Sequence, residues 1–126
     1  MNRALVSVGF SMVLVVGLLG LLGCGVQESP ELKYQKAKVQ AELKIMELEE
    51  IMIPLRAMGR GDFSALPTDP DELKRLSEKM KPANIQKLAN EISQATLKVF
   101  QLKPPGYDDD YKQWTQQMRE RLEAIQ

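Results

Sequence analysis

Apolar side chains recur at steps of three or four residues along most of this chain. That spacing places them on one face of an α-helix, where they form a stripe that must be covered. Between residues 31 and 58 the stripe comprises Tyr34, Ala37, Ala41, Ile45, Leu48, Met52 and Leu55. No stretch alternates apolar and polar residues as a strand does. The pattern therefore predicts an all-α protein.

The segment 31–58 also carries a second, weaker apolar face, which indicates a helix with neighbours on two sides, as in a bundle. This second face comprises Val39, Leu43, Met46 and Ile53. Pro54 lacks an amide hydrogen, so we expect the helix to kink or end near it. The Gly- and Pro-containing stretch "AMGRGDFSALPTDP" follows and predicts a loop.

Three further helices are expected after this loop. Asp69 can cap a short helix that has Pro70 at its first position, Glu72 three residues after the cap, and the apolar residues Leu73, Leu76 and Met80. Pro82 shifts the phase of the pattern, which predicts a bend near Lys81. The next stripe comprises Ile85, Leu88, Ile92, Ala95, Val99 and Leu102, and the last comprises Tyr111, Trp114, Met118, Leu122 and Ile125. We predict a small up-and-down bundle of three to four helices.

The N-terminus carries a different signal. Residues 4–22 contain no charge and follow Arg3, as the apolar core of an export signal follows its basic start. The sequence "LLGC" at 21–24 resembles a bacterial lipobox. This resemblance implies cleavage between Gly23 and Cys24 and attachment of lipid to the Cys24 thiol. It divides the chain into a helical signal peptide that is cleaved off (1–23), a lipidated cysteine with a short tether (24–30), and a helical bundle domain (31–126).

Two alternatives compete with lipidation. The apolar run nearly reaches the ~20 residues of a transmembrane helix, so it could remain as an uncleaved anchor. Cys24 could also be an ordinary buried thiol. The residues after Cys24 supply no basic flank of the kind that a stop-transfer segment carries, which favours the lipoprotein. The expected location is the cell membrane or outer membrane, with the domain facing the periplasm or cell exterior. Gly25, where an aspartate would signal inner-membrane retention in similar proteins, favours the outer membrane.

Composition narrows the function. Without residues 1–23 the chain has 103 residues and, after loss of Arg3 from 17 basic and 17 acidic residues, a net charge of −1. Basic residues are not in excess, so the composition does not favour a nucleic-acid partner. The sequence has no histidine and only one cysteine, which removes the usual acid–base group and most zinc sites. We therefore expect no enzyme activity, no metal and no cofactor.

Four clusters could still carry function. Glu47, Glu49 and Glu50 in "ELEE" are interpreted as a solvated helix face. A hydrolase needs two carboxylates that converge on one substrate bond, and nothing in the sequence fixes such an arrangement. Residues 108–110 are three aspartates, which are better explained as negative charge at a helix N-terminus than as a calcium loop. The methionines at helical spacing favour core packing over copper or haem ligation. The "RGD" triplet at 60–62 is interpreted as a chance match to an adhesion motif.

The helix order over 31–126, with "KPPGYDDDYKQW" opening the last helix, is similar to four-helix bundles of the cytochrome c-prime and cytochrome b562 type. That resemblance implies a haem-binding or electron-carrying ancestor. The covalent haem motif C-x-x-C-H is absent, and Met46 could supply one axial ligand without a histidine to complete the pair. The alternative function is therefore a haem-bundle-like small-molecule or electron carrier that has lost its haem site.

The leading prediction is a membrane-anchored extracytoplasmic lipoprotein whose helical domain binds a protein or envelope partner, or has a structural role, without catalysis. Its expected contact surface is the rigid turn before the last helix, where Tyr107 and Trp114 are predicted to be exposed aromatic residues. A lipid-anchored hydrolase has the least support, because no nucleophile, base and oxyanion donor can be assembled.

Overall fold

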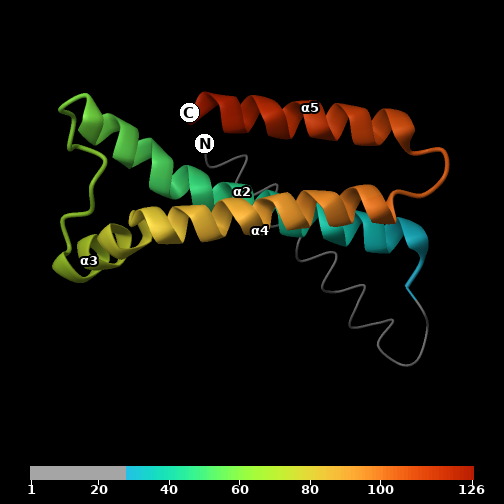
Figure 1. The fold of residues 1–126 in the computed structure, drawn as a ribbon, viewed down its shortest axis with the longest axis horizontal. Coiled ribbons are helices and arrows are strands. Elements are labelled where there is room, and N and C mark those ends of the chain that lie inside the picture. The colour runs from blue at the N-terminus through green and yellow to red at the C-terminus, as the bar shows by residue number, and fades with distance from the viewer. Residues whose placement is uncertain (1–27) are drawn as a thin grey trace.

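The computed structural model describes residues 28–126. It contains four helices, α2 (Pro30–Gly59), α3 (Pro70–Lys79), α4 (Pro82–Leu102) and α5 (Asp108–Ala124), and no strand within the described part (Figure 1). The prediction of a small all-α bundle is confirmed. The predicted signal peptide, with its cleavage site at Gly23 and Cys24, lies outside the described residues.

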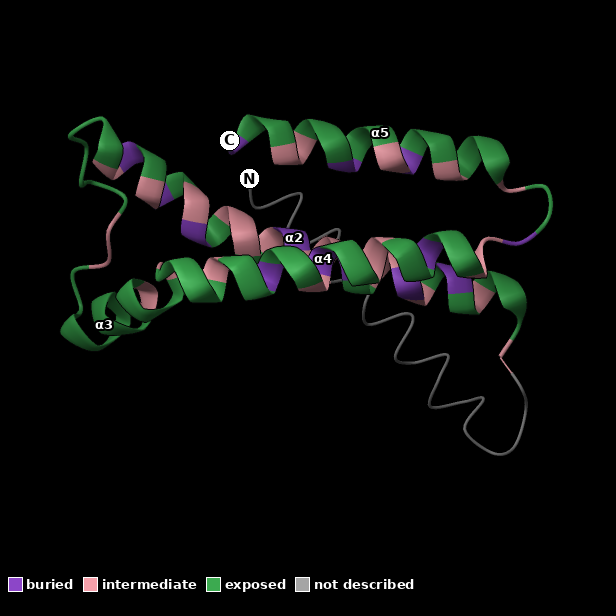
Figure 2. Ribbon diagram, viewed as in Figure 1, coloured by how far each residue is buried: buried purple, intermediate pink, exposed green. Residues whose placement is uncertain are grey.

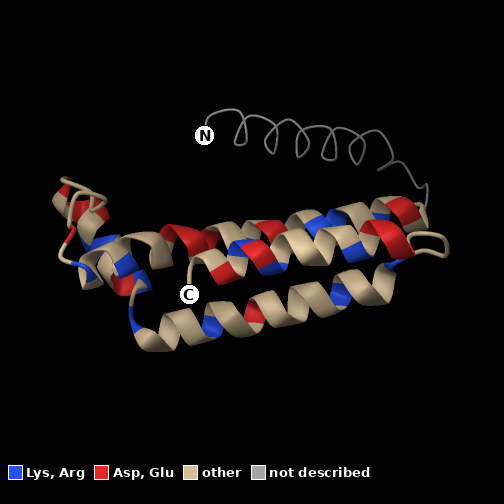
Figure 3. Ribbon diagram, turned by 90° about the horizontal axis from the view of Figure 1, so that it is seen from above, with Lys and Arg blue, Asp and Glu red and all other residues tan. Residues whose placement is uncertain are grey.

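Helices α2, α4 and α5 run in alternating directions, so the bundle has the up-and-down order that was expected (Figure 1). Helix α2 packs most extensively against α4, while the short α3 lies at the end of the bundle where α2 finishes. Seen from above, the three long helices run alongside one another, with positive and negative residues interspersed along the bundle (Figure 3).

Helix α2 begins at a capped N-terminus. Ser29 accepts a hydrogen bond from the backbone N–H of Leu32 at 3.1 Å, and Pro30 occupies the first turn, where no amide donor is needed. The helix continues through Pro54 to Gly59. Its last turns tilt away from α4 (Figure 1), which is the kind of deviation that a proline inside a helix produces.

Helix α3 starts at Pro70 with Asp69 in the cap position, as predicted, but the Asp69 side chain makes no capping hydrogen bond. None of its ten residues is buried. The bend into α4 falls at Met80 and Lys81, and Asn84 Nδ2 donates a 2.7 Å hydrogen bond to the Glu78 carbonyl across it. Helix α3 is therefore positioned mainly by its connection to α4.

The core lies where α2, α4 and α5 face one another (Figure 2). Its buried members are Tyr34, Ala37, Ala41, Ile45 and Ile51 from α2, Leu88, Ile92 and Val99 from α4, and Trp114 and Met118 from α5. These positions follow the predicted stripes of α4 and α5 and the first half of the stripe of α2.

The stripe of α2 departs from prediction after Leu48. Met52 and Leu55 were expected to be core positions, but Ile51, Pro54 and Ala57 are the buried residues instead. Ile51, Pro54 and Ala57 are three residues apart, which is less than one full turn of 3.6 residues, so the buried face moves gradually around the helix. The rotation coincides with the segment in which α2 leaves α4, so these residues are covered by different neighbours.

Within residues 28–126, no helix is both long enough and apolar enough to cross a bilayer.

Candidate functional site

The two aromatic residues of the predicted contact surface, at the turn between α4 and α5, differ in their exposure. Tyr107 is half-buried, and its ring meets the Tyr34 ring edge-on at 5.5 Å between centroids. Trp114 is 4% exposed and belongs to the core, so the prediction that it is exposed is wrong. It lies on the same helix face as Tyr111 and Met118, and that face is the one that α5 turns towards the bundle. Trp114 is a core residue and offers no surface for a partner.

A partly buried polar contact lies beside this turn. The Tyr34 hydroxyl donates a 2.7 Å hydrogen bond to Asp110 Oδ2, and Lys38 Nζ lies 3.0 Å from the same oxygen. Burial, together with the hydrogen bond to Asp110, raises the pKa of Tyr34. The hydrogen bond from Tyr34, reinforced by that from Lys38, lowers the pKa of Asp110. Asp110 therefore joins the start of α5 to α2, while its neighbour Asp108 pairs with Lys103 at 2.7 Å.

Replacing Tyr34 with phenylalanine is expected to raise the pKa of Asp110 towards the ordinary value near ~3.9. The lowered pKa stabilises the folded protein above that value, and this stabilisation is lost as the pH falls through the folded-state pKa. An NMR titration of the Asp110 carboxyl carbon measures the change. Tyr107→Phe, which removes a hydroxyl that makes no hydrogen bond to Asp110, is the control. An unchanged Asp110 pKa in Tyr34→Phe would contradict the assigned contact.

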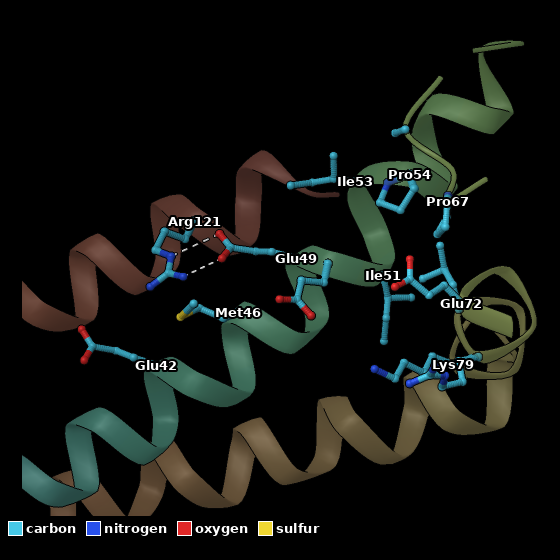
Figure 4. A pocket seen from close by; sticks show the side chains of 14 residues that line it. Glu42, Met46, Glu49, Ile51, Ile53, Pro54, Pro67, Glu72, Lys79 and Arg121 are labelled. Atoms are coloured by element: carbon cyan, nitrogen blue, oxygen red, sulfur yellow. Dashed lines mark hydrogen bonds and ion pairs between the residues drawn. The ribbon is translucent and has the colours of Figure 1, made fainter. Parts of the chain in front are cut away.

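A concave surface lies at the opposite end of the bundle (Figure 4). We call it the α2–α3 groove, and its volume is about 820 Å³. Its lining comprises Glu42, Met46, Glu49, Glu50, Ile51, Ile53 and Pro54 from α2, Ala65 and Pro67 from the following loop, Glu72, Arg75, Leu76 and Lys79 from α3, and Arg121 from α5.

The groove forms because α3 does not close onto α2. After Gly59 the chain reverses in a turn in which the Asp62 N–H donates to the Ala57 carbonyl at 2.8 Å and Gly61 adopts a φ of +83°. A residue with a side chain is strained in that left-handed conformation. The Asp62 carboxylate accepts hydrogen bonds from the backbone and hydroxyl of Ser64. The "RGD" triplet thus forms an exposed turn that directs the loop towards α3.

One ion pair crosses the edge of the groove. Arg121 Nε and Nη2 lie 3.1 Å and 2.5 Å from the two carboxylate oxygens of Glu49, a paired geometry that fixes both side chains (Figure 4). These hydrogen bonds raise the pKa of Arg121. The pair links α5 to α2 at a point where both side chains are less than one-third exposed.

We expect a double-mutant cycle with Glu49→Ala and Arg121→Ala to give a coupling free energy of roughly 0.5–1 kcal/mol in urea unfolding, decreasing as salt is added. The exposed pair Glu78 and Lys81, one turn apart along the chain, is the control and should couple more weakly because water screens it. Zero coupling between Glu49 and Arg121 at low salt would show that the pair does not hold α5 to α2.

The remaining charged groups of the groove form no ion pair within the described part of the chain. They are Glu42 and Glu50 on α2, and Glu72, Arg75 and Lys79 on α3. In a second groove, between α2 and α4, most of the charged residues are paired: Lys36 with Glu28 at 2.9 Å and Lys44 with Glu91 at 3.6 Å. Only Lys33 and Lys98 of its charged residues form no ion pair in the described part of the chain. The α2–α3 groove is therefore the candidate functional site. Among residues 28–126, no group of three or more acidic or thiol side chains is arranged to hold a metal ion.

Sequence reasoning did not identify this groove. The carboxylates of "ELEE" were interpreted as a solvated face, yet Glu49 pairs with Arg121 and Glu50 lines the groove. A partial signal was present in the second apolar face of α2, because Met46 and Ile53 belong to it and both line the groove. The part of the groove that α3 lines depends on where the preceding loop places that helix. The spacing of apolar residues in the sequence does not indicate that position.

A scan of protein-family models gave no match to this chain. Searches among curated proteins and among solved structures likewise gave no match.

Proposed function

We propose that this chain is a membrane-anchored extracytoplasmic lipoprotein whose helical domain binds a protein partner without catalysis. The lipobox-like order ending in Cys24 supports the anchor. A lipidated cysteine with two or three acyl chains stays in the membrane, whereas one chain gives only marginal binding. The anchor would lie in the cell membrane or outer membrane, with the domain on the periplasmic or exterior side.

The observation that carries the binding role is the exposed apolar surface of the α2–α3 groove. Ile53 is 55% exposed and Met46 is half-buried, and both side chains line the groove, so apolar surface is open at this site. Phe63, in the loop that borders this end of the bundle, is also exposed. Apolar groups gathered in a concave surface with a charged edge are typical of a binding site.

The position of the groove suits a tethered binding protein. Helix α2 starts six residues after Cys24, and Ile53 lies 23 residues further along it, roughly 35 Å at 1.5 Å per residue. The turn between α4 and α5 lies near the start of α2, whereas α3 lies at the far end (Figure 1). A lipid on Cys24 therefore attaches at the end opposite the groove, which leaves the groove free for a partner protein.

The groove residues favour binding over chemistry. Its carboxylates either pair with arginine, as Glu49 does, or line a wide open surface without a nucleophile beside them. The haem-carrier alternative gains no support from the arrangement, because Met46, its candidate ligand, lines the open groove rather than the core. The sequence also contains no histidine to act as its partner ligand.

Metabolic labelling tests the anchor. In a bacterial host that lipidates exported proteins, growth with labelled palmitate should label the wild-type protein and leave Cys24→Ser unlabelled, because Cys24 is the only thiol in the sequence. Equal expression of the two forms, checked by immunoblotting, is the control. An unlabelled wild type, or equal label on both forms, would rule out lipidation at Cys24.

A further inference from the structure

We propose that the α2–α3 groove binds an amphipathic helix of a partner protein, one with an apolar row between a basic edge and an acidic edge. The inference rests on the proposed binding function and specifies the chemistry of the partner. The groove contains both requirements for such a helix, an apolar strip and two sides of different charge.

The apolar strip consists of side chains from both helices that border the groove. Met46 and Ile53 come from α2 and Leu76 comes from α3, and none of the three is buried. The stretch of α2 from 42 to 54 spans roughly 18 Å, which matches about three turns of a helix lying along it. Residues 28–126 offer no sheet edge for a partner strand, so helix-in-groove is the mode that this surface fits.

The charges on the two sides of the groove favour a partner that carries both basic and acidic residues. On the α2 side Glu42 and Glu50 are acidic and form no ion pair in the described structure, while on the α3 side Arg75 and Lys79 are basic and equally unpaired. Glu72, also on α3, makes that side mixed but still net positive. A partner helix with a basic edge facing α2 and an acidic edge facing α3 would balance the charge on both sides of the groove. An anionic lipid surface would instead select basic residues alone, and the groove lies at the end away from the tether.

Synthetic helical peptides provide the probe. Three peptides share one row of leucines and differ in their edges: lysine on one side and glutamate on the other, lysine on both, or glutamate on both. Fluorescence titration with the full-length protein in detergent micelles should show the mixed peptide binding about tenfold more tightly than either single-sign peptide at low salt. Because a mixed helix can reverse its direction in the groove, exchanging its two edges is not an informative control.

Variants of the protein locate the site. Glu50→Lys removes the net negative charge of the α2 side, because Glu42 is then balanced by the new lysine. It should weaken the mixed peptide and strengthen the peptide with glutamate on both edges. Ile53→Ser should weaken every peptide several-fold. Leu97→Ser, the same kind of change at an equally exposed site on α4 (56% against 55%), should leave binding unchanged. Neither serine replacement touches the core, so both variants should fold.

Two results would overturn the inference. One is equal binding of the three peptides with no response to Glu50→Lys, which would mean that the charged sides do not select the partner. The other is equal weakening by Ile53→Ser and Leu97→Ser, which would place binding elsewhere. Failure of palmitate labelling would remove the anchor and leave these peptide results unaffected, so the two proposals fail separately.

Discussion

The rest of the structure depends on the packing of α2 against α4. Ala37 and Ala41, both buried on α2, have small side chains that let the two helices approach closely, and Ile45 continues the same face. Burial of apolar surface provides the main stabilisation of such a contact. Helix α5 is then held by its buried face and by two polar links to α2, Asp110 with Tyr34 at one end and Arg121 with Glu49 at the other. Both other long helices therefore contact α2, and the course of α2 decides the shape of the bundle.

The groove follows from the point at which α2 stops following α4. Beyond Leu48 the buried face rotates to Ile51 and Pro54, and the last turns of α2 tilt away from α4. The loop and α3 fill only part of the space, because α3 buries none of its residues. A deviation that would weaken a continuous bundle thus creates an open apolar surface beside a stable core. A partner in the groove would contact Met46, Ile53 and Leu76, none of which is buried, so it would leave the packing of α2 against α4 unchanged.

Local signals in the sequence predicted the helices well. Pro70, Pro82 and the "KPPGY" turn mark helix boundaries through the geometry of proline and glycine, and the apolar spacing of α4 and α5 predicted their buried faces. Trp114 was assigned to that buried face and yet also predicted as exposed; the periodicity was the better guide. The pairing of Glu49 with Arg121, 72 positions apart, could not be predicted, because it depends on the three-dimensional placement of two helix faces. The same holds for the groove, which depends on the path of the loop.

Helix α2 has one face that holds the fold and another that is exposed in the groove. Urea unfolding of Ile45→Ala and Ile53→Ala tests it with the same substitution two turns apart on one helix. Ile45 is fully buried, so its truncation should lower the free energy of unfolding by about 2–5 kcal/mol. Ile53→Ala should change it by less than about 0.5 kcal/mol. Comparable losses in the two variants would contradict the account, because they would show that the groove face of α2 is itself packed in the folded protein.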